Sequence, residues 1–158
     1  QALIDESDVA CFNFYGATAL AEFPYYEPQG EAEIRADIAR MLDISGSKQI
    51  VIQELGMWSG STLLPSNAEI QRRFFEIFFE EMERQDRIRA AYVFQLVDWS
   101  PEVTQIFVDI LRDENVPEEF IDVFVESLET IGLIRYEDGM RRPALDEFVK
   151  WLGRFSES

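Results

Sequence analysis

Histidine is absent from the 158-residue sequence, and cysteine occurs only once. The missing histidine excludes a Ser-His-Asp triad, a Cys-His pair and any metal site with a histidine ligand in this chain. The single cysteine, Cys11, forms neither an internal disulfide nor a zinc cluster, and its place in an apolar run favours buried packing. We therefore expect no metal and no cofactor, and we assign any chemistry to carboxylates, tyrosine and tryptophan.

Positive charge is also scarce. The chain has 31 acidic and 14 basic residues, a net charge of −17, and its only lysines are Lys48 and Lys150. A charge of this sign repels phosphate backbones and anionic lipids, so neither nucleic acid nor a membrane is an expected partner. The acidity is typical of a solvated surface, with a patch for a cationic partner as the alternative.

Short apolar runs alternate with longer segments of helical period. The runs cover residues 8–16, 49–56 and 89–99. In the other segments, apolar side chains recur every three or four residues, which is typical of helices. Continuous apolar strands separated by helices predict an α/β fold with a parallel sheet. Because the chain is 47% hydrophobic and shows no linker, we expect residues 1–158 to form a single domain.

Capping signals predict where several helices begin. Ser66 and Glu69 fit the S-x-x-E capping box after the second apolar run. Ser100 directly precedes a proline, which is typical of an N-cap followed by the first helical position. Two further prolines, Pro117 and Pro143, each precede a segment of helical period. We therefore expect three helices after the third strand.

Polar side chains stand at the carboxyl end of each predicted strand. In open α/β sheets and in (β/α)8 barrels, sites are built at these ends. Glu54 lies between Ile52 and Leu55 in an apolar run, where an uncompensated charge is costly and packing gives no reason for it. Glu54 is therefore the strongest candidate for a site residue. The other polar residues at the strand ends are Asn13, Tyr15, Gln53, Gln95, Asp98 and Trp99.

Structural roles are open for most of these residues. Asn13 and Gln95 could each satisfy backbone groups where a strand ends. Asp98 could accept hydrogen bonds at the start of the helix that follows it, as N-cap residues do. Tyr15 and Trp99 could be core aromatics with only their polar atoms at the edge. Taken together, however, the three polar strand ends point to a shared site at one rim.

The order of these segments resembles the large clan of retaining (β/α)8-barrel glycoside hydrolases. DVACFNFYG is similar to the clan's sixth strand, IVIQELGMWSG to the seventh with its nucleophilic glutamate, and VFQLVDW to the eighth with its sugar-platform tryptophan. The segment GLIRYEDGMRRPALDEFVKWL is similar to the C-terminal segment that these enzymes commonly share. The resemblance implies a partial TIM barrel, about strands six to eight, with residues 101–130 as a helical insertion.

The resemblance also implies roles for individual residues. Glu54 would be the nucleophile, Tyr15 would donate a hydrogen bond near it, and Trp99 would stack on the sugar. Trp58, just past the second strand, would contribute to a neighbouring subsite. Such enzymes act on oligosaccharides or polysaccharides and are commonly exported, which implies an extracellular or periplasmic location. The side chains suited to sugar hydroxyls are Asn13, Gln95 and Asp98.

One part of the clan's pattern is missing. Its acid/base glutamate follows an asparagine at the end of the fourth strand, and no Asn-Glu pair occurs in this sequence. Three parallel strands with crossover helices on one face also leave the other face and both edges open. We expect that the missing amino-terminal barrel strands belong to a longer protein. Self-association of the chain, or cover by the helices after residue 101, would also close the open face.

Two other functions fit parts of the sequence. A non-catalytic carbohydrate-binding or assembly protein with a half-barrel fold would keep the rim aromatics and lack the acid/base. A flavodoxin-like binding domain would keep the open sheet, but the segment GMWSGS lacks the G-x-G-x-x-G or G-K-[ST] pattern of phosphate loops. The hydrolase remains our leading hypothesis.

Overall fold

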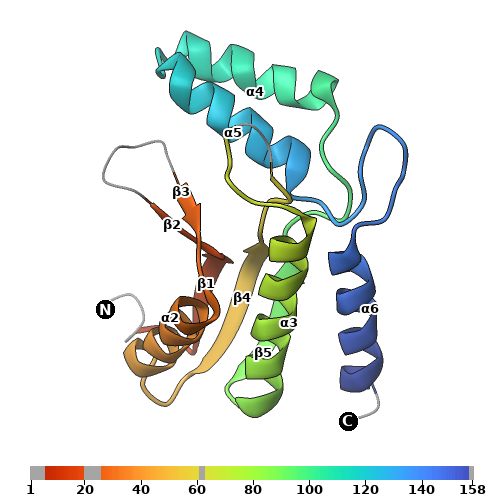
Figure 1. The fold of residues 1–158 in the computed structure, drawn as a ribbon. Coiled ribbons are helices and arrows are strands. Elements are labelled where there is room, and N and C mark those ends of the chain that lie inside the picture. Colours follow the sequence, from red (N-terminus) through yellow and green to blue (C-terminus); the bar gives the residue numbers. More distant parts are fainter. Residues whose placement is uncertain (1–5, 20–25, 61–62, 157–158) are drawn as a thin grey trace.

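The molecule has an α/β fold in which strands and helices alternate along most of the chain (Figure 1). The structure is a computed structural model, and it describes residues 6–19, 26–60 and 63–156. Within these ranges, the elements are three parallel strands, a short hairpin and five helices. No helix in them combines the length and the apolarity that a membrane span requires.

The parallel sheet has the strand order β1-β4-β5. Its strands are β1 (Val9–Tyr15), β4 (Gln49–Gly56) and β5 (Ile88–Val93). The central strand, β4, pairs with both neighbours in parallel. All three carboxyl ends therefore meet at one edge of the sheet, as the sequence predicts.

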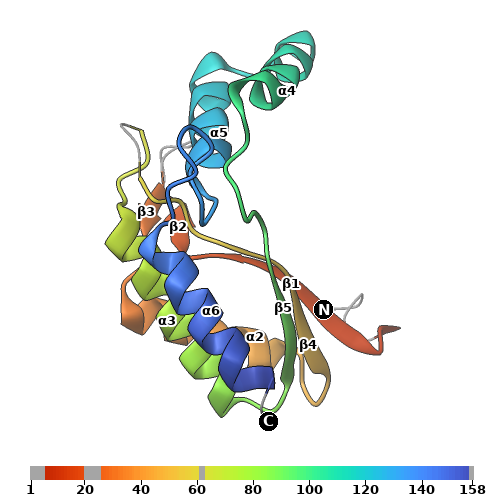
Figure 2. The same cartoon turned by 90° about the vertical axis from the view of Figure 1, so that its right-hand side faces the viewer.

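Three helices cover one face of this sheet (Figure 2). They are α2 (Glu31–Ile44), α3 (Ala68–Arg84) and α6 (Pro143–Ser156). α3 packs against both α2 and α6. The prediction that Pro143 begins the final helix is confirmed, because a proline fits the first turn, where its missing N–H has no partner to lose.

The core lies between the sheet and these helices. From the sheet it takes Ile50 and Ile52, which have no exposed surface. From α3 it takes Phe74, Phe75 and Phe78; Phe78 follows the other two by four and three residues, which places it on the same helix face as both. Phe74 and Phe75 meet edge to face with ring centroids 5.3 Å apart. Helix α3 therefore contributes a large part of the core with its apolar face.

The opposite face of the sheet has no cover from the described residues (Figure 2). Tyr92 of β5 is 62% exposed on this side, and Cys11 of β1 is exposed as well. The prediction that Cys11 is buried is wrong, because the apolar run that contains it has only one covered face. In a closed barrel, this open face would be the interior.

Two further helices lie beyond the carboxyl ends of the strands (Figures 1 and 2). They are α4 (Pro101–Asp113) and α5 (Glu118–Thr130), and they pack against each other. Ser100 is the N-cap of α4, since its side chain accepts a hydrogen bond from the Val103 amide, which confirms that capping prediction. The pair stands over the strand ends and leaves the open face of the sheet uncovered.

A short hairpin follows β1, and the sequence pattern does not predict it. Its strands are β2 (Ala17–Ala19) and β3 (Tyr26–Pro28), which pair in antiparallel fashion. Three-residue strands give too little alternation for a sequence pattern to stand out. The hairpin places Tyr26 beside the carboxyl ends of the parallel strands.

Two boundaries differ from the predictions. The third strand ends at Val93 and not at residue 99, because the chain leaves the sheet soon after it and forms an isolated bridge between Val97 and Ile134. Helix α3 is capped by Asn67 and not by Ser66. The Asn67 side chain accepts from two amides of the first turn, which satisfies donors that have no partner within the helix.

The fold is thus that of a partial (β/α)8 barrel, with three parallel strands, crossover helices on one face and extra helices towards the C-terminus. Among the described residues, β1 and β5 are the outer strands of this sheet, and further barrel strands could add to the outer edge of each.

Candidate functional site

The carboxyl ends of β1 and β4 bring three of the predicted site residues together. In the parallel ladder, Asn13 pairs with Glu54, and Tyr15 pairs with Gly56. Because side chains alternate between the two faces of a strand, Asn13 and Tyr15 point away from the helix-covered face, which takes Phe14. The three polar side chains therefore lie on the side that corresponds to the interior of a barrel.

A bulge in β4 puts Glu54 on this side. Ile50 and Ile52 face the helices, and strict alternation would send Glu54 to the same buried face. The pairing with β1 shifts by one residue at this point: Phe12 pairs with Ile52, whereas Asn13 pairs with Glu54. The pairing with β5 shifts in the same stretch. The extra residue, Gln53, reverses the alternation, so that Leu55 is fully buried and Glu54 is not.

Tyr15 and Glu54 are joined directly. The Tyr15 hydroxyl donates a hydrogen bond to Oε2 of Glu54. Burial, this hydrogen bond and the negative charge of Glu54 together raise the pKa of Tyr15 above its ordinary value. Tyr15 therefore keeps its proton at neutral pH and acts as a donor to the carboxylate.

Tyr15 and Glu54 border a cavity of about 700 Å3, which we name the Glu54 cavity. Its polar lining at the strand ends is Asn13, Tyr15 and Glu54, and its carboxylates are Glu54 and Asp37. Asp37 is engaged elsewhere, because it accepts from Gln29 at 2.6 Å and lies 3.3 Å from the guanidinium of Arg40. The rest of the lining is largely aromatic and aliphatic: Phe94, Trp99, Phe107, Phe120, Val123, Phe124, Leu128 and Ile131.

Trp58 lines the same cavity from the loop that follows β4. Only 6% of it is exposed, and its ring meets that of Tyr26 edge to face at 5.9 Å. Its indole Nε1 is buried and has no hydrogen-bond partner among the residues that the structure describes. An indole N–H without a partner is unusual in a buried place, and a ligand oxygen would satisfy it.

Gln95 and Trp99 form a unit after β5. With its amide oriented to satisfy its neighbours, Gln95 accepts from the Trp99 Nε1 at 2.8 Å and donates to the Leu128 carbonyl at 3.0 Å. Gln95 is 6% exposed and lies behind Trp99, so it positions that ring. The ring packs on Phe107 with centroids 5.0 Å apart and borders the Glu54 cavity.

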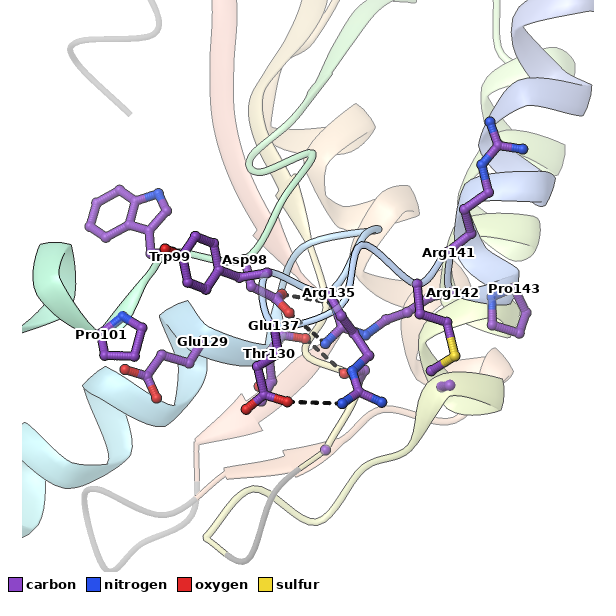
Figure 3. A pocket seen from close by; sticks show the side chains of 15 residues that line it. Asp98, Trp99, Pro101, Glu129, Thr130, Arg135, Glu137, Arg141, Arg142 and Pro143 are labelled. Carbon is purple, nitrogen blue, oxygen red and sulfur yellow. Dashed lines mark hydrogen bonds and ion pairs between the residues drawn. The ribbon is translucent and has the colours of Figure 1, made fainter.

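Asp98 is held in a buried ion pair (Figure 3). Both of its oxygens accept from the Arg142 guanidinium at 2.7 Å, and Oδ1 also accepts from the Gly132 amide at 2.8 Å. The side chains of Asp98 and Arg142 are 4% and 8% exposed. Asp98 does not cap α4, since Ser100 does. Its carboxylate borders a second cavity of about 410 Å3, and Trp99 lines both cavities.

Gln71, which bonds to the cavity-lining residue Ile131, is a residue that the sequence pattern does not single out. It is fully buried on α3, and its Nε2 lies within hydrogen-bond distance of the carbonyls of Met57, Ile131 and Gly132. It therefore ties the end of β4 to the end of α5. The sequence gives one sign of this role, since a glutamine interrupts the apolar face of α3. The partners of Gln71 lie about 14 and 60 residues away, and the helical pattern does not identify them.

The described residues contain no cluster of three or more His, Cys, Asp or Glu side chains that could hold a metal ion. What the arrangement offers is a carboxylate with a tyrosine donor at the end of a partly apolar cavity with two tryptophans. This combination suits a neutral organic ligand with both hydroxyl groups and apolar surface.

Comparisons with known proteins reveal similarity in structure and none in sequence. No family model matches the chain, and no curated protein does. The fold is similar to the crystal structure of Ruminococcus gnavus beta-glucuronidase, with a TM-score of 0.56, 14% identity and 91% of this chain covered. A second structure of Ruminococcus gnavus beta-glucuronidase gives 0.55, 15% and 92%, and Lactobacillus rhamnosus beta-glucuronidase gives 0.52, 16% and 95%.

The chain spans only 22–23% of the length of these beta-glucuronidases. At such low identity, the similarity concerns the fold alone. The chemistry of this chain is therefore inferred from the residues at the carboxyl ends of its strands. In architecture, the chain corresponds to a segment of a barrel of the kind that these glycoside hydrolases possess.

Proposed function

We propose that this chain is the carboxyl-terminal part of a retaining glycoside hydrolase and that Glu54 is its nucleophile. The observation that carries the proposal is the hydrogen bond from Tyr15 to Glu54 at the mouth of a cavity lined by Trp58 and Trp99. The fold likeness to beta-glucuronidases supports the same assignment. Barrel enzymes place their catalytic groups at this edge of the sheet.

In the proposed reaction, a Glu54 oxygen attacks the anomeric carbon, and the bond from that carbon to the leaving oxygen breaks. The leaving oxygen takes a proton from a second carboxylic acid. That group, now a carboxylate, then removes a proton from water as the water oxygen attacks the anomeric carbon. The sugar leaves, and the Glu54 carboxylate is restored. The net change is the addition of one water across the glycosidic bond.

Tyr15 has two effects in this scheme. Its hydrogen bond fixes the orientation of the Glu54 carboxylate before the attack. During attack, negative charge leaves Glu54, so the bond weakens as the covalent intermediate forms. It strengthens again as the carboxylate is released, and Tyr15 thereby assists the second step.

The second carboxyl group has to lie about 5–5.5 Å from Glu54. Asp37, the other carboxylate that lines the cavity, is already bound to Gln29 and lies on a helix. We therefore assign the acid/base to barrel strands outside this chain, in a longer protein, since these strands would also cover the open face of the sheet. Closure of that face by a second copy of the chain is the alternative.

Sugar contacts follow from the same geometry. Asn13, level with Glu54 in the ladder, is suited to a sugar hydroxyl near the cleavage point. Trp58 would donate its N–H, which has no partner among the described residues, to another hydroxyl, and Trp99 would offer its ring face. Asp98 and Gln95 are bound to protein groups, so the proposal for the sugar site does not rest on them.

The test is turnover by the protein at its full encoded length. A panel of p-nitrophenyl β-D-glycosides (glucuronide, galactoside, glucoside and mannoside) identifies the sugar. Glu54→Gln should then lower kcat on the order of 10³-fold or more, because the amide is a poor nucleophile. Glu119→Gln on the exposed surface of α5 is the matched control and should keep full turnover.

Other outcomes would contradict the proposal. Unchanged turnover in Glu54→Gln would remove Glu54 from the mechanism, and inversion of the anomeric centre, seen by proton NMR, would exclude a covalent intermediate on it. Sugar binding without turnover of any glycoside, weakened by Trp99→Ala, would favour the non-catalytic carbohydrate-binding alternative.

A further inference from the structure

The Glu54 cavity has two chemically unlike ends. One end holds Asn13, Tyr15 and Glu54, and the other is a wall of four phenylalanines, which we name the phenylalanine wall: Phe94, Phe107, Phe120 and Phe124. We infer that the phenylalanine wall binds the aglycone of the substrate, and that this aglycone is a hydrophobic aryl or alkyl group and not a second sugar. The inference rests on the proposed function of Glu54.

The phenylalanine wall is built mainly by the helices beyond the sheet. Phe107 lies on α4, Phe120 and Phe124 on α5, and Phe94 directly follows β5. The rings of Phe120 and Phe124 stack with centroids 5.9 Å apart, and Phe107 meets Phe124 edge to face at 6.3 Å. All four are nevertheless only half-buried. Phe107, Phe120 and Phe124 are therefore held in place by one another, and all four rings line the cavity.

The phenylalanine wall starts next to the carboxylate. Tyr15 donates its hydroxyl to Glu54, and the same ring meets Phe94 edge to face with centroids 5.9 Å apart. Only one aromatic ring thus separates the proposed nucleophile from the apolar end. A glycoside whose anomeric carbon lies at Glu54 has a substituent within reach of that end.

The apolar end offers little to a sugar. Its remaining lining is Trp99, Val123, Leu128 and Ile131, with one hydroxyl, that of Ser127, and the Trp99 N–H is already bound to Gln95. The Ser127 hydroxyl already donates to the Phe124 carbonyl at 2.6 Å. Each sugar ring carries several hydroxyls, and burying them without partners is costly. A hydrocarbon group meets no such cost and removes exposed phenylalanine surface from water.

The inference can be tested with n-alkyl glycosides in the full-length protein. The sugar is the one that the p-nitrophenyl panel selects, and the chain is lengthened from methyl to octyl. Along this series the leaving alcohol keeps nearly the same acidity, so changes in kcat/KM report apolar contact. We expect kcat/KM to rise about threefold for each methylene that the cavity accommodates.

Variants test whether the phenylalanine wall causes the rise in kcat/KM with chain length. Phe120→Ala and Phe124→Ala should flatten the rise with chain length while methyl glycoside turnover persists. Ser127→Phe, which fills the apolar end without removing a core group, should abolish the gain beyond short chains. Phe155→Ala is the control: Phe155 is also half-buried, but it contacts Phe79 and Trp151 on the far side of the molecule. It should leave the slope unchanged.

The outcomes separate this inference from the proposed function. A flat chain-length series with normal, Glu54-dependent turnover would overturn the aglycone assignment and leave the hydrolase proposal standing. It would mean that another part of the protein covers the phenylalanine wall. Faster hydrolysis of an oligosaccharide than of octyl glycoside, unchanged in Phe124→Ala, would also overturn it. Absence of turnover with every glycoside would instead defeat the proposed function.

Discussion

The two ends of the parallel sheet use their polar side chains differently. At the amino end, Arg87 donates to the carbonyls of Lys48, at 2.9 and 3.1 Å, and of Leu42, at 3.0 Å. Lys48 in turn donates to the carbonyl of Ser7. These cations close loops by satisfying backbone acceptors. At the carboxyl end, Tyr15 and Glu54 face a cavity instead.

The difference separates groups that hold the fold from groups that are placed for a ligand. A backbone carbonyl bound by an arginine is satisfied, whereas a carboxylate at a cavity mouth and a buried Trp58 N–H keep bonding capacity. A position at the carboxyl end does not by itself make a side chain available to a ligand, however. The Asp98–Arg142 pair also lies at the carboxyl end, yet its bonds are made within the protein. It fixes the polypeptide that surrounds the site.

The largest effect on stability should follow from breaking that pair. Arg142→Met leaves the Asp98 carboxylate buried without its cation, which should lower the free energy of unfolding by about 3–5 kcal/mol. Urea unfolding of the full-length protein measures it. The double variant Asp98→Asn, Arg142→Met should recover part of the loss, because the asparagine amide is uncharged and its oxygen can still accept from Gly132. An equal or greater loss in the double variant would contradict this account.

Tyr15→Phe should affect chemistry more than folding. It removes the donor to Glu54, and we expect kcat to fall about 10- to 100-fold with an unfolding free energy close to that of the parent protein. Tyr92→Phe is the matched control, since Tyr92 is exposed on the open face of the sheet. If Tyr15→Phe kept full turnover, the hydrogen bond to Glu54 would be a structural contact only.

The same residue has an expected signature at high pH. The pKa of Tyr15 is raised by burial and by Glu54, so its phenol should ionise later than an ordinary tyrosine near pH 10. A raised pKa in the folded state stabilises the fold fully below the ordinary pKa, and this contribution is lost as pH rises through the raised value. Ultraviolet titration should accordingly lose its latest-ionising phenol in Tyr15→Phe. If Tyr15→Phe instead removed a phenol that ionises at lower pH, the assignment of the raised pKa to Tyr15 would be wrong.

The smallest effect should come from the amino end. Arg87→Met deprives two backbone carbonyls of their donors, which should lower the free energy of unfolding by about 1–2 kcal/mol. Turnover per folded molecule should not change, because Arg87 is remote from the strand ends that border the cavity. Arg40→Met, at a guanidinium that is 73% exposed, should have no measurable effect on either quantity. A loss of turnover in Arg87→Met would contradict the view that polar side chains at the amino end of the sheet only hold the fold.

Local patterns predict much of the fold. The strand at 49–56 and the helices that begin after Ser100 and at Pro143 are where the sequence places them, because apolar period and caps act within a few residues. The third strand is shorter than its composition predicts. Its apolar character continues past Val93, but a strand needs a partner for its backbone, and none is visible in a single sequence.

The site is predictable only in outline. Glu54 is recognisable as a charge in an apolar run, and the neighbouring strand ends suggest Asn13 and Tyr15. The partner of Asp98 is not recognisable: Arg142 lies 44 positions away, and nothing nearby in the sequence marks the pair. The phenylalanine wall is hidden for a different reason. On an amphipathic helix, a phenylalanine that lines a cavity and one that packs in a core give the same periodic signal.

The bulge at Gln53 has a consequence for how such a site can arise. In a strictly alternating strand, position 54 would lie on the same face as Ile50 and Ile52, so a carboxylate there would interrupt the core. With one additional residue, Ile50, Ile52 and Leu55 all remain in the core while Glu54 faces the cavity. A rim carboxylate is therefore compatible with an intact buried register on both sides of Gln53.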